Sequence, residues 1–147
     1  MLQGSCLCRQ VQFEVSEVVG PFELCHCSRC RKVSGSAFIA GIYAKRAGLR
    51  FLKGADLIKT FDAPILETPP AYRSCFCGTC GAPMPDPNGG SALVEIPAGS
   101  LDVNPDIKPD KHIFVELKAP WYEIEDGLPQ FDKVAIREHR AAHTHER

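Results

Sequence analysis

Residues 76–81 read Phe-Cys-Gly-Thr-Cys-Gly, so that two residues separate Cys77 from Cys80. In a knuckle of this kind the glycines allow a tight backbone turn, which aims both sulfurs at one ion. A second pair, Cys6 and Cys8, lies near the start of the chain. Together the four cysteines predict a closed, structural zinc site that joins distant parts of the chain and contributes directly to folding.

A third group of cysteines lies in residues 25–30, which read Cys-His-Cys-Ser-Arg-Cys and offer three sulfurs without an obvious fourth ligand. Three protein ligands with one open position are typical of catalytic zinc, because the free corner can take water or substrate. We therefore expect two zinc ions per chain, the catalytic one on Cys25, Cys27 and Cys30. The alternative is a second closed site completed by one further side chain: His26, Cys75 or His112.

Disulfides are the competing interpretation of the eight cysteines. Cysteines one or two residues apart would close very small rings, in which the S–S geometry is strained. Residues 1–6 show no basic stretch followed by an apolar run, as a secretory signal would. We therefore expect a reducing, cytoplasmic location, where clustered thiols usually serve metal or redox chemistry. Cys75 would point to the same side of a strand as Cys77, and we expect it to be a small buried hydrophobic residue.

Length and composition set the class of protein. The chain has 147 residues, 44% hydrophobic content and a formal charge of -1, which predicts one globular domain over residues 1–147 with its own core. The near balance of charge argues against nucleic acid as a partner, and no apolar stretch is long enough to cross a membrane.

Short extended segments dominate the pattern. Residues 10–15 alternate between apolar and polar side chains, as a half-buried strand does. The break at residues 54–56 predicts a hairpin between the strands on either side of it. Further strands are predicted over residues 38–44, 49–52, 57–61, 71–76, 92–96 and 112–117.

Helix is scarce, so the predicted class is mainly β. Residues 28–33 predict one short helical turn closed by Gly35, and residues 132–142 predict a terminal helix. The charged stretch 137–147 is predicted instead to be a frayed, solvated tail. Residues 132–147 are therefore expected to be a terminal helix or a frayed tail.

The motifs together resemble one protein family. Gly4-Ser5-Cys6-Leu7-Cys8, the segment Cys25 to Lys32 with Ser34-Gly35-Ser36, and Arg73-x-x-Phe76-Cys77-x-x-Cys80-Gly81 resemble the glutathione-dependent formaldehyde-activating (GFA or CENP-V) family. His112-Ile113, Trp121 and Leu128-Pro129-x-Phe131 extend the likeness, which runs from about residue 3 to about residue 131.

The resemblance implies an Mss4-like fold of packed antiparallel sheets. It also implies a structural zinc on Cys6, Cys8, Cys77 and Cys80, and a catalytic zinc on Cys25, Cys27 and Cys30. The implied reaction is the reversible joining of a thiol such as glutathione to formaldehyde, which makes the protein a carbon–sulfur lyase and synthase whose partners are a small thiol and an aldehyde.

Neighbouring residues have secondary roles in this hypothesis. Three side chains could receive substrate carboxylates or form a solvated basic turn: Arg29, Arg31 and Lys32. Two histidines are possible proton carriers, and two aromatic residues are possible pocket walls: His26, His112, Trp121 and Tyr122. The alternatives are a non-enzymatic zinc module that binds a protein partner, and a methionine sulfoxide reductase, for which only Cys75 would be a spare nucleophile.

Overall fold

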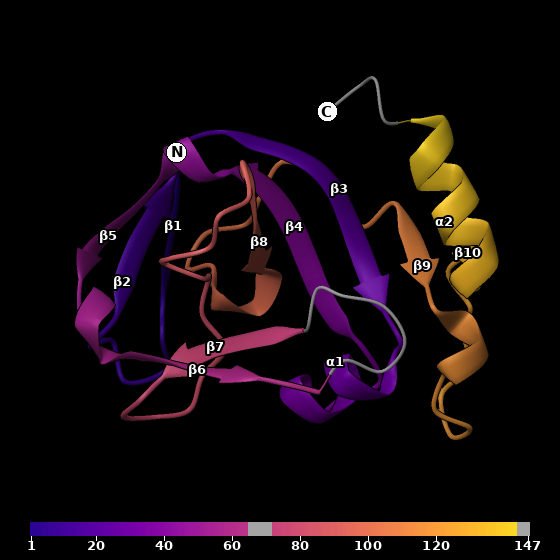
Figure 1. The fold of residues 1–147 in the computed structure, drawn as a ribbon, viewed down its shortest axis with the longest axis horizontal. Coiled ribbons are helices and arrows are strands. Elements are labelled where there is room, and N and C mark those ends of the chain that lie inside the picture. The colour runs from indigo at the N-terminus through magenta and orange to yellow at the C-terminus, as the bar shows by residue number, and fades with distance from the viewer. Residues whose placement is uncertain (65–71, 144–147) are drawn as a thin grey trace. The chain divides into compact units, whose positions relative to one another are not determined.

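The computed structural model describes residues 1–64 and 72–143. These residues form ten strands, two α-helices and four short 3-10 turns, which confirms the mainly β class (Figure 1). The described chain forms two compact units, Met1–Gly20 with Ile42–Asp106 and Pro21–Gly41 with Ile107–Arg147. The organisation of residues 1–147 as a single domain stays a prediction.

The first unit contains two antiparallel sheets. In one sheet β2 pairs with β1 on one side and with β5 on the other, and in the other sheet β6 pairs with β7 (Figure 1). The strands have the following bounds: β1 Leu2–Ser5, β2 Gln12–Val15, β5 Leu49–Lys53, β6 Ile58–Asp62, β7 Arg73–Cys77 and β8 Leu93–Pro97. Strand β7 lies within the predicted segment 71–76 except for its last residue, Cys77, and residue 71 lies outside the described residues.

Alternation along these strands builds the core of the first unit. Val11, Phe13 and Val15 are almost completely buried, as the pattern of residues 10–15 predicts. The Phe13 ring lies 6.1 Å from the ring of its cross-strand partner Phe51, measured between centroids. The core also includes two cysteines of the predicted structural site, so that site is built into the packing of this unit: Cys6 and Cys77.

The predicted hairpin at residues 54–56 is wrong. β5 pairs with β2, whereas β6 pairs with β7, so the two strands flanking the break belong to different sheets. Gly54 adopts a left-handed conformation with φ of 71°, and a 3-10 turn over Ala55–Leu57 follows. This turn redirects the chain to a new sheet instead of folding it back.

The second unit is built on a parallel arrangement that the sequence did not predict. β9 (Lys111–Ile113) runs parallel to β3 and to β10 (Gln130–Phe131), so the sheets are mixed and not all antiparallel. The strands β3 (Val18–Cys25) and β4 (Ile39–Lys45) contribute residues to both units.

The predicted strand over residues 112–117 is only half correct. The strand ends at Ile113, Phe114 takes the left-handed conformation with φ of 56°, and Val115–Leu117 form a 3-10 turn. The apolar residues after Ile113 therefore mark a turn and not an extension of the sheet.

Both predicted helices are present. α1 (Ser28–Ser34) ends at Gly35, which is left-handed with φ of 64°, and α2 (Lys133–Ala142) begins after Asp132, whose side chain accepts a hydrogen bond from the Ala135 amide. The prediction of a frayed tail from residue 137 is wrong as far as residue 142, because that stretch is helical. Residues 144–147 lie outside the described residues.

Two contacts hold α2 within the second unit, where it lies beside β10 (Figure 1). Ile136 is buried, and Arg140 donates to the buried carboxylate of Glu23 on β3 at 2.7 Å. No described helix is both long enough and apolar enough to cross a bilayer.

Candidate metal centres

Four cysteine sulfurs of the first unit meet in one group. The sulfurs of Cys6, Cys8, Cys77 and Cys80 all lie within 4.8 Å of one another. The Cys6 and Cys8 sulfurs are 3.5 Å apart, and Cys8 lies 3.9 Å from Cys77 across 69 residues of sequence. The fold thus brings together the residues predicted for the structural site.

Tight turns aim these sulfurs inward. After Cys6, the Arg9 backbone is left-handed with φ of 59°, and the Val11 amide donates to the Cys6 sulfur at 3.3 Å. In the knuckle, Gly81 has φ of 75° and its amide donates to the Cys77 carbonyl at 2.8 Å. The positive φ values explain why the chain needs a glycine at position 81 for this turn.

Backbone hydrogen bonds from Ala82 and Cys8 lower the pKa of Cys80 to about 6. Cys80 is therefore a thiolate at neutral pH, the form in which cysteine binds metal.

The second unit holds a group of three sulfurs. Cys25 ends β3, Cys27 caps the N-terminus of α1 and Cys30 lies in its first turn, and the three sulfurs lie within 4.8 Å of one another. The Cys27 sulfur accepts a hydrogen bond from the Cys30 amide at 3.4 Å. The strand end and the helix start thus position all three sulfurs through local structure.

These three thiols share their protons unequally. Hydrogen bonds from the Cys25 and Cys30 thiols lower the pKa of Cys27 far below its usual value, while the hydrogen bond that Cys25 shares with Cys27 raises the pKa of Cys25. Interaction with both neighbours raises the pKa of Cys30 as well. A cation bound here would displace the remaining protons, so the affinity of the site for the cation would decrease as the pH is lowered.

Among the described residues, none of the three side chains considered as a fourth ligand joins the second group: His26, Cys75 or His112. Cys75 is 6% exposed and lies on the same face of β7 as Cys77, which confirms that it is a buried residue. Burial raises the pKa of the Cys75 thiol to about 11. The donor sets are four and three soft thiolate sulfurs, so each group could hold one metal ion, and zinc suits such ligands.

His26 and His112 form a buried pair. Nε2 of His26 lies 2.8 Å from Nδ1 of His112, and Nε2 of His112 lies 2.9 Å from a carboxylate oxygen of Asp126. Burial is the main cause that lowers the pKa of His26 to about 4, and interaction with the neighbouring His112 adds to it, so His26 is neutral at physiological pH. Sequence analysis missed Asp126, whose only local signal is the Asp-Gly turn that it begins.

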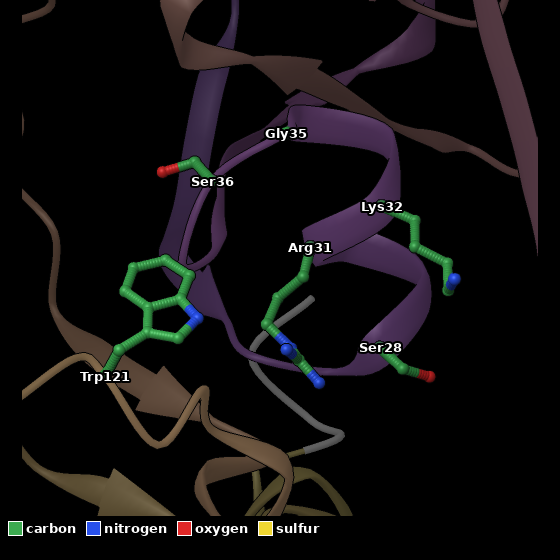
Figure 2. A pocket seen from close by; sticks show the side chains of 6 residues that line it. All are labelled: Ser28, Arg31, Lys32, Gly35, Ser36 and Trp121. Carbon is green, nitrogen blue, oxygen red and sulfur yellow. The ribbon is translucent and has the colours of Figure 1, made fainter.

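A pocket of about 420 Å³ lies on α1, and two residues of its lining, Ser28 and Arg31, directly follow Cys27 and Cys30 in sequence (Figure 2). Figure 2 shows the Trp121 ring on one side of the pocket and Ser28 on the other, with the Arg31 side chain between them. Trp121 is 70% exposed, so it is a pocket wall and not a core residue, whereas Tyr122 packs against the His26 ring at 5.9 Å. The pocket is lined by Ser28, Arg31, Lys32, Gly35, Ser36 and Trp121.

Arg31 has an unused donor. Its Nε atom is buried and makes no hydrogen bond within the described part of the chain. Because a buried N–H without an acceptor is costly, this donor suits an acceptor that a ligand brings.

Comparison with known proteins finds a family, a relative and a solved structure that are similar to this chain. The family model described as glutathione-dependent formaldehyde-activating enzyme matches residues 1–117. A protein of Halomonas elongata named "Putative glutathione-dependent formaldehyde-activating enzyme" is 34% identical over 130 residues, which cover 85% of this chain and 82% of that protein. A crystal structure of a Rhodobacter sphaeroides protein shares the fold with a TM-score of 0.53 at 19% identity, covering 88% of this chain and 99% of that one.

Proposed function

Because the chain belongs to the glutathione-dependent formaldehyde-activating enzyme family, we propose that it is a zinc-dependent carbon–sulfur lyase and synthase. The substrate is a small thiol–aldehyde adduct such as S-hydroxymethylglutathione. In the joining direction, the thiol sulfur bonds to the aldehyde carbon, the C=O double bond becomes single and the thiol proton ends on the oxygen. Cleavage reverses these changes, and neither direction needs an oxidant or a reductant.

One observation carries the proposal: the three sulfurs of Cys25, Cys27 and Cys30 converge, and no fourth cysteine, histidine or carboxylate of the described chain completes their group. Catalytic zinc sites keep one position open in this way, whereas structural sites have four protein ligands. A zinc ion in this group would acidify an incoming thiol or polarise the aldehyde oxygen, and the three thiolate charges favour the first role. The proposed structural zinc has the four ligands Cys6, Cys8, Cys77 and Cys80.

The pocket explains how the chain could orient a thiol. Arg31 directly follows Cys30, and its buried Nε donor faces no acceptor among the described residues. A carboxylate on the substrate would accept this hydrogen bond, and the neighbouring Lys32 would add a second positive charge. The exposed Trp121 ring would cover the apolar part of the thiol. A thiol with a carboxylate, such as glutathione, therefore fits this pocket better than a neutral thiol.

The proposed compartment is the reducing cytoplasm. All eight cysteines are free thiols, and seven of them lie in the two groups that could hold metal. An oxidising compartment would favour disulfides over such clustered thiolates.

The test combines metal analysis with NMR measurement of hydroxymethyl exchange between formaldehyde and several thiols. We expect two zinc ions per chain and faster exchange for glutathione than for 2-mercaptoethanol, which lacks a carboxylate. Cys27→Ser should keep one zinc and lose the acceleration, and Arg31→Met should slow exchange with glutathione more than with 2-mercaptoethanol. Two zinc ions without acceleration for any thiol would instead support a non-enzymatic zinc module.

A further inference from the structure

Three side chains form a hydrogen-bonded chain that starts within the segment carrying the three cysteines and ends at the surface. His26 lies between Cys25 and Cys27 in sequence, and both His26 and His112 are completely buried. Nε2 of His26 is 2.8 Å from Nδ1 of His112, and Nε2 of His112 is 2.9 and 3.1 Å from the two oxygens of Asp126. The Asp126 side chain is 45% exposed.

The backbone fixes where this chain runs. His112 lies in the middle of β9, opposite Leu24 of β3 on one side and Gln130 of β10 on the other. The His26 amide donates to the carbonyl of Ile113 at 3.0 Å, which continues the pairing of β3 and β9 past the end of the strand. Strand register therefore sets the distance between the two imidazole rings, independently of any ligand.

Asp126 is also held in place. One of its carboxylate oxygens accepts the Leu128 amide at 3.0 Å across the turn formed by Gly127, whose φ is 73°. This hydrogen bond and the one from His112 lower the pKa of Asp126. The carboxylate is thus oriented toward the ring before any substrate or ion arrives.

The three groups specify the direction of each hydrogen bond. An ionised carboxylate can only accept, so His112 donates from Nε2, and a ring with only that proton accepts at Nδ1. His26 must then donate from Nε2, which leaves its Nδ1 as an acceptor. Nδ1 of His26 is buried.

Aromatic rings pack against the pair. The His26 ring lies 5.4 Å from Phe38 and 5.9 Å from Tyr122, measured between centroids, and Phe38 packs edge-on against His112 at 6.3 Å. A side chain confined in this way transmits its position to the backbone that carries it.

We propose that His112 and Asp126 are positioning residues that fix His26 and thereby hold the backbone of Cys25 and Cys27 where the three sulfurs converge. The inference rests on the proposed function in one respect, that these sulfurs bind a metal ion. Hydrogen-bonding partners one step removed from the ligands typically change metal affinity by about 10- to 100-fold. We expect an effect of this size on the second zinc ion and none on the four-cysteine site, whose group contains no histidine.

The test uses zinc-loaded protein and four variants. Asp126→Ala removes the acceptor at a partly exposed position, and Asp126→Asn keeps one oxygen that can accept from His112. His112→Phe removes the ring bonds while keeping an aromatic side chain. The matched control is His143→Phe. His143 directly follows α2, is exposed, and lies outside the hydrogen-bonded chain of His26, His112 and Asp126.

Two readouts separate positioning from packing. Chelator competition measures the affinity of each zinc ion, and long-range ¹H–¹⁵N NMR of the imidazole groups identifies which ring nitrogen carries the proton. We expect protons on Nε2 of both His26 and His112 in the parent protein. Asp126→Ala should weaken the second zinc about 10-fold and mix the His112 tautomers, with Asp126→Asn closer to the parent and His143→Phe unchanged.

Unchanged zinc affinity in folded Asp126→Ala and His112→Phe would overturn the inference, and so would a proton on Nδ1 of His26 in the parent protein. Failure of the proposed function looks different: the parent protein would bind only one zinc ion. In that case the tautomers and the amide exchange rates of residues 25–30 still decide the inference. Faster exchange in Asp126→Ala than in Asp126→Asn would support positioning, and equal rates would refute it.

Discussion

Replacing Cys77 by serine should unfold the protein under conditions that leave a Cys27→Ser variant folded. The Cys77 side chain is completely buried in the core of the first unit, within 4.8 Å of three other sulfurs. Structural zinc sites contribute about 10–16 kcal/mol of apparent binding free energy, which is about 2.5–4 kcal/mol per ligand if shared evenly among four. A domain of this size has only about 5–15 kcal/mol of total stability. The serine variant should therefore lose a large part of it.

Cys27→Ser perturbs a different kind of position. The Cys27 sulfur caps α1 by accepting the Cys30 amide at 3.4 Å, and serine is among the best residues for this role. The cost to the fold should stay below about 1 kcal/mol, because the cap is preserved. At about 3 °C per kcal/mol, Tm should fall by roughly 8–12 °C for Cys77→Ser and by less than about 3 °C for Cys27→Ser.

The assay is thermal melting followed by circular dichroism, with metal content measured on the same samples. Cys27→Ser should retain one zinc ion per chain, whereas Cys77→Ser should lose the zinc of the four-cysteine group and melt at the lower temperature. An equal loss of Tm in the two variants would refute the division into a structural and a functional site.

Three further outcomes are expected. Burial raises the pKa of Cys75 to about 11 from 9.0, so native Cys75 should react with iodoacetamide at pH 8 about 100-fold more slowly than a free cysteine. Mass spectrometry should show this rate rising tenfold per pH unit below pH 11. A rate like that of an exposed thiol would contradict the burial of Cys75. Gly54→Ala should lower the free energy of unfolding, measured by urea titration, by at least about 1 kcal/mol, because φ at this position is +71° and the new Cβ would meet a backbone carbonyl. The control Gly90→Ala places its Cβ in open space and should leave the free energy of unfolding unchanged. Arg140→Ala should cost about 3 kcal/mol or more by leaving the Glu23 carboxylate buried without this ion pair, and Glu23→Gln in the same chain should restore part of the loss.

Local spacing made the cysteine groups predictable. The knuckle at Cys77 and Cys80 and the cap at Cys27 are each determined by a few neighbouring residues, so their turns follow from glycine positions and helix-start rules. The short helix ended by Gly35 was predictable for the same reason. The ligand roles of these residues stay predictions.

Pairing between distant strands was not predictable from one sequence. The segments on either side of Gly54 look like a hairpin, but hydrophobic alternation does not say which strand will be the partner. The parallel pairing of β9 with β3 likewise joins residues far apart in sequence, such as Leu24 and His112. Asp126 was missed because its contact with His112 depends on that topology and on no local motif.

The two metal groups differ in what holds their sulfurs together, and this difference bears on what each can do. In the first group, Cys8 and Cys77 are 69 residues apart, so bringing them together costs the conformational entropy of the chain between them. An ion bound to both would offset this cost and so stabilise the folded chain. In the second group all three sulfurs come from six consecutive residues, and the helix cap at Cys27 and the bond from His26 to His112 already define their geometry. An ion that is not needed to close the fold can keep a position free for substrate, because losing or exchanging a ligand there does not unfold the chain.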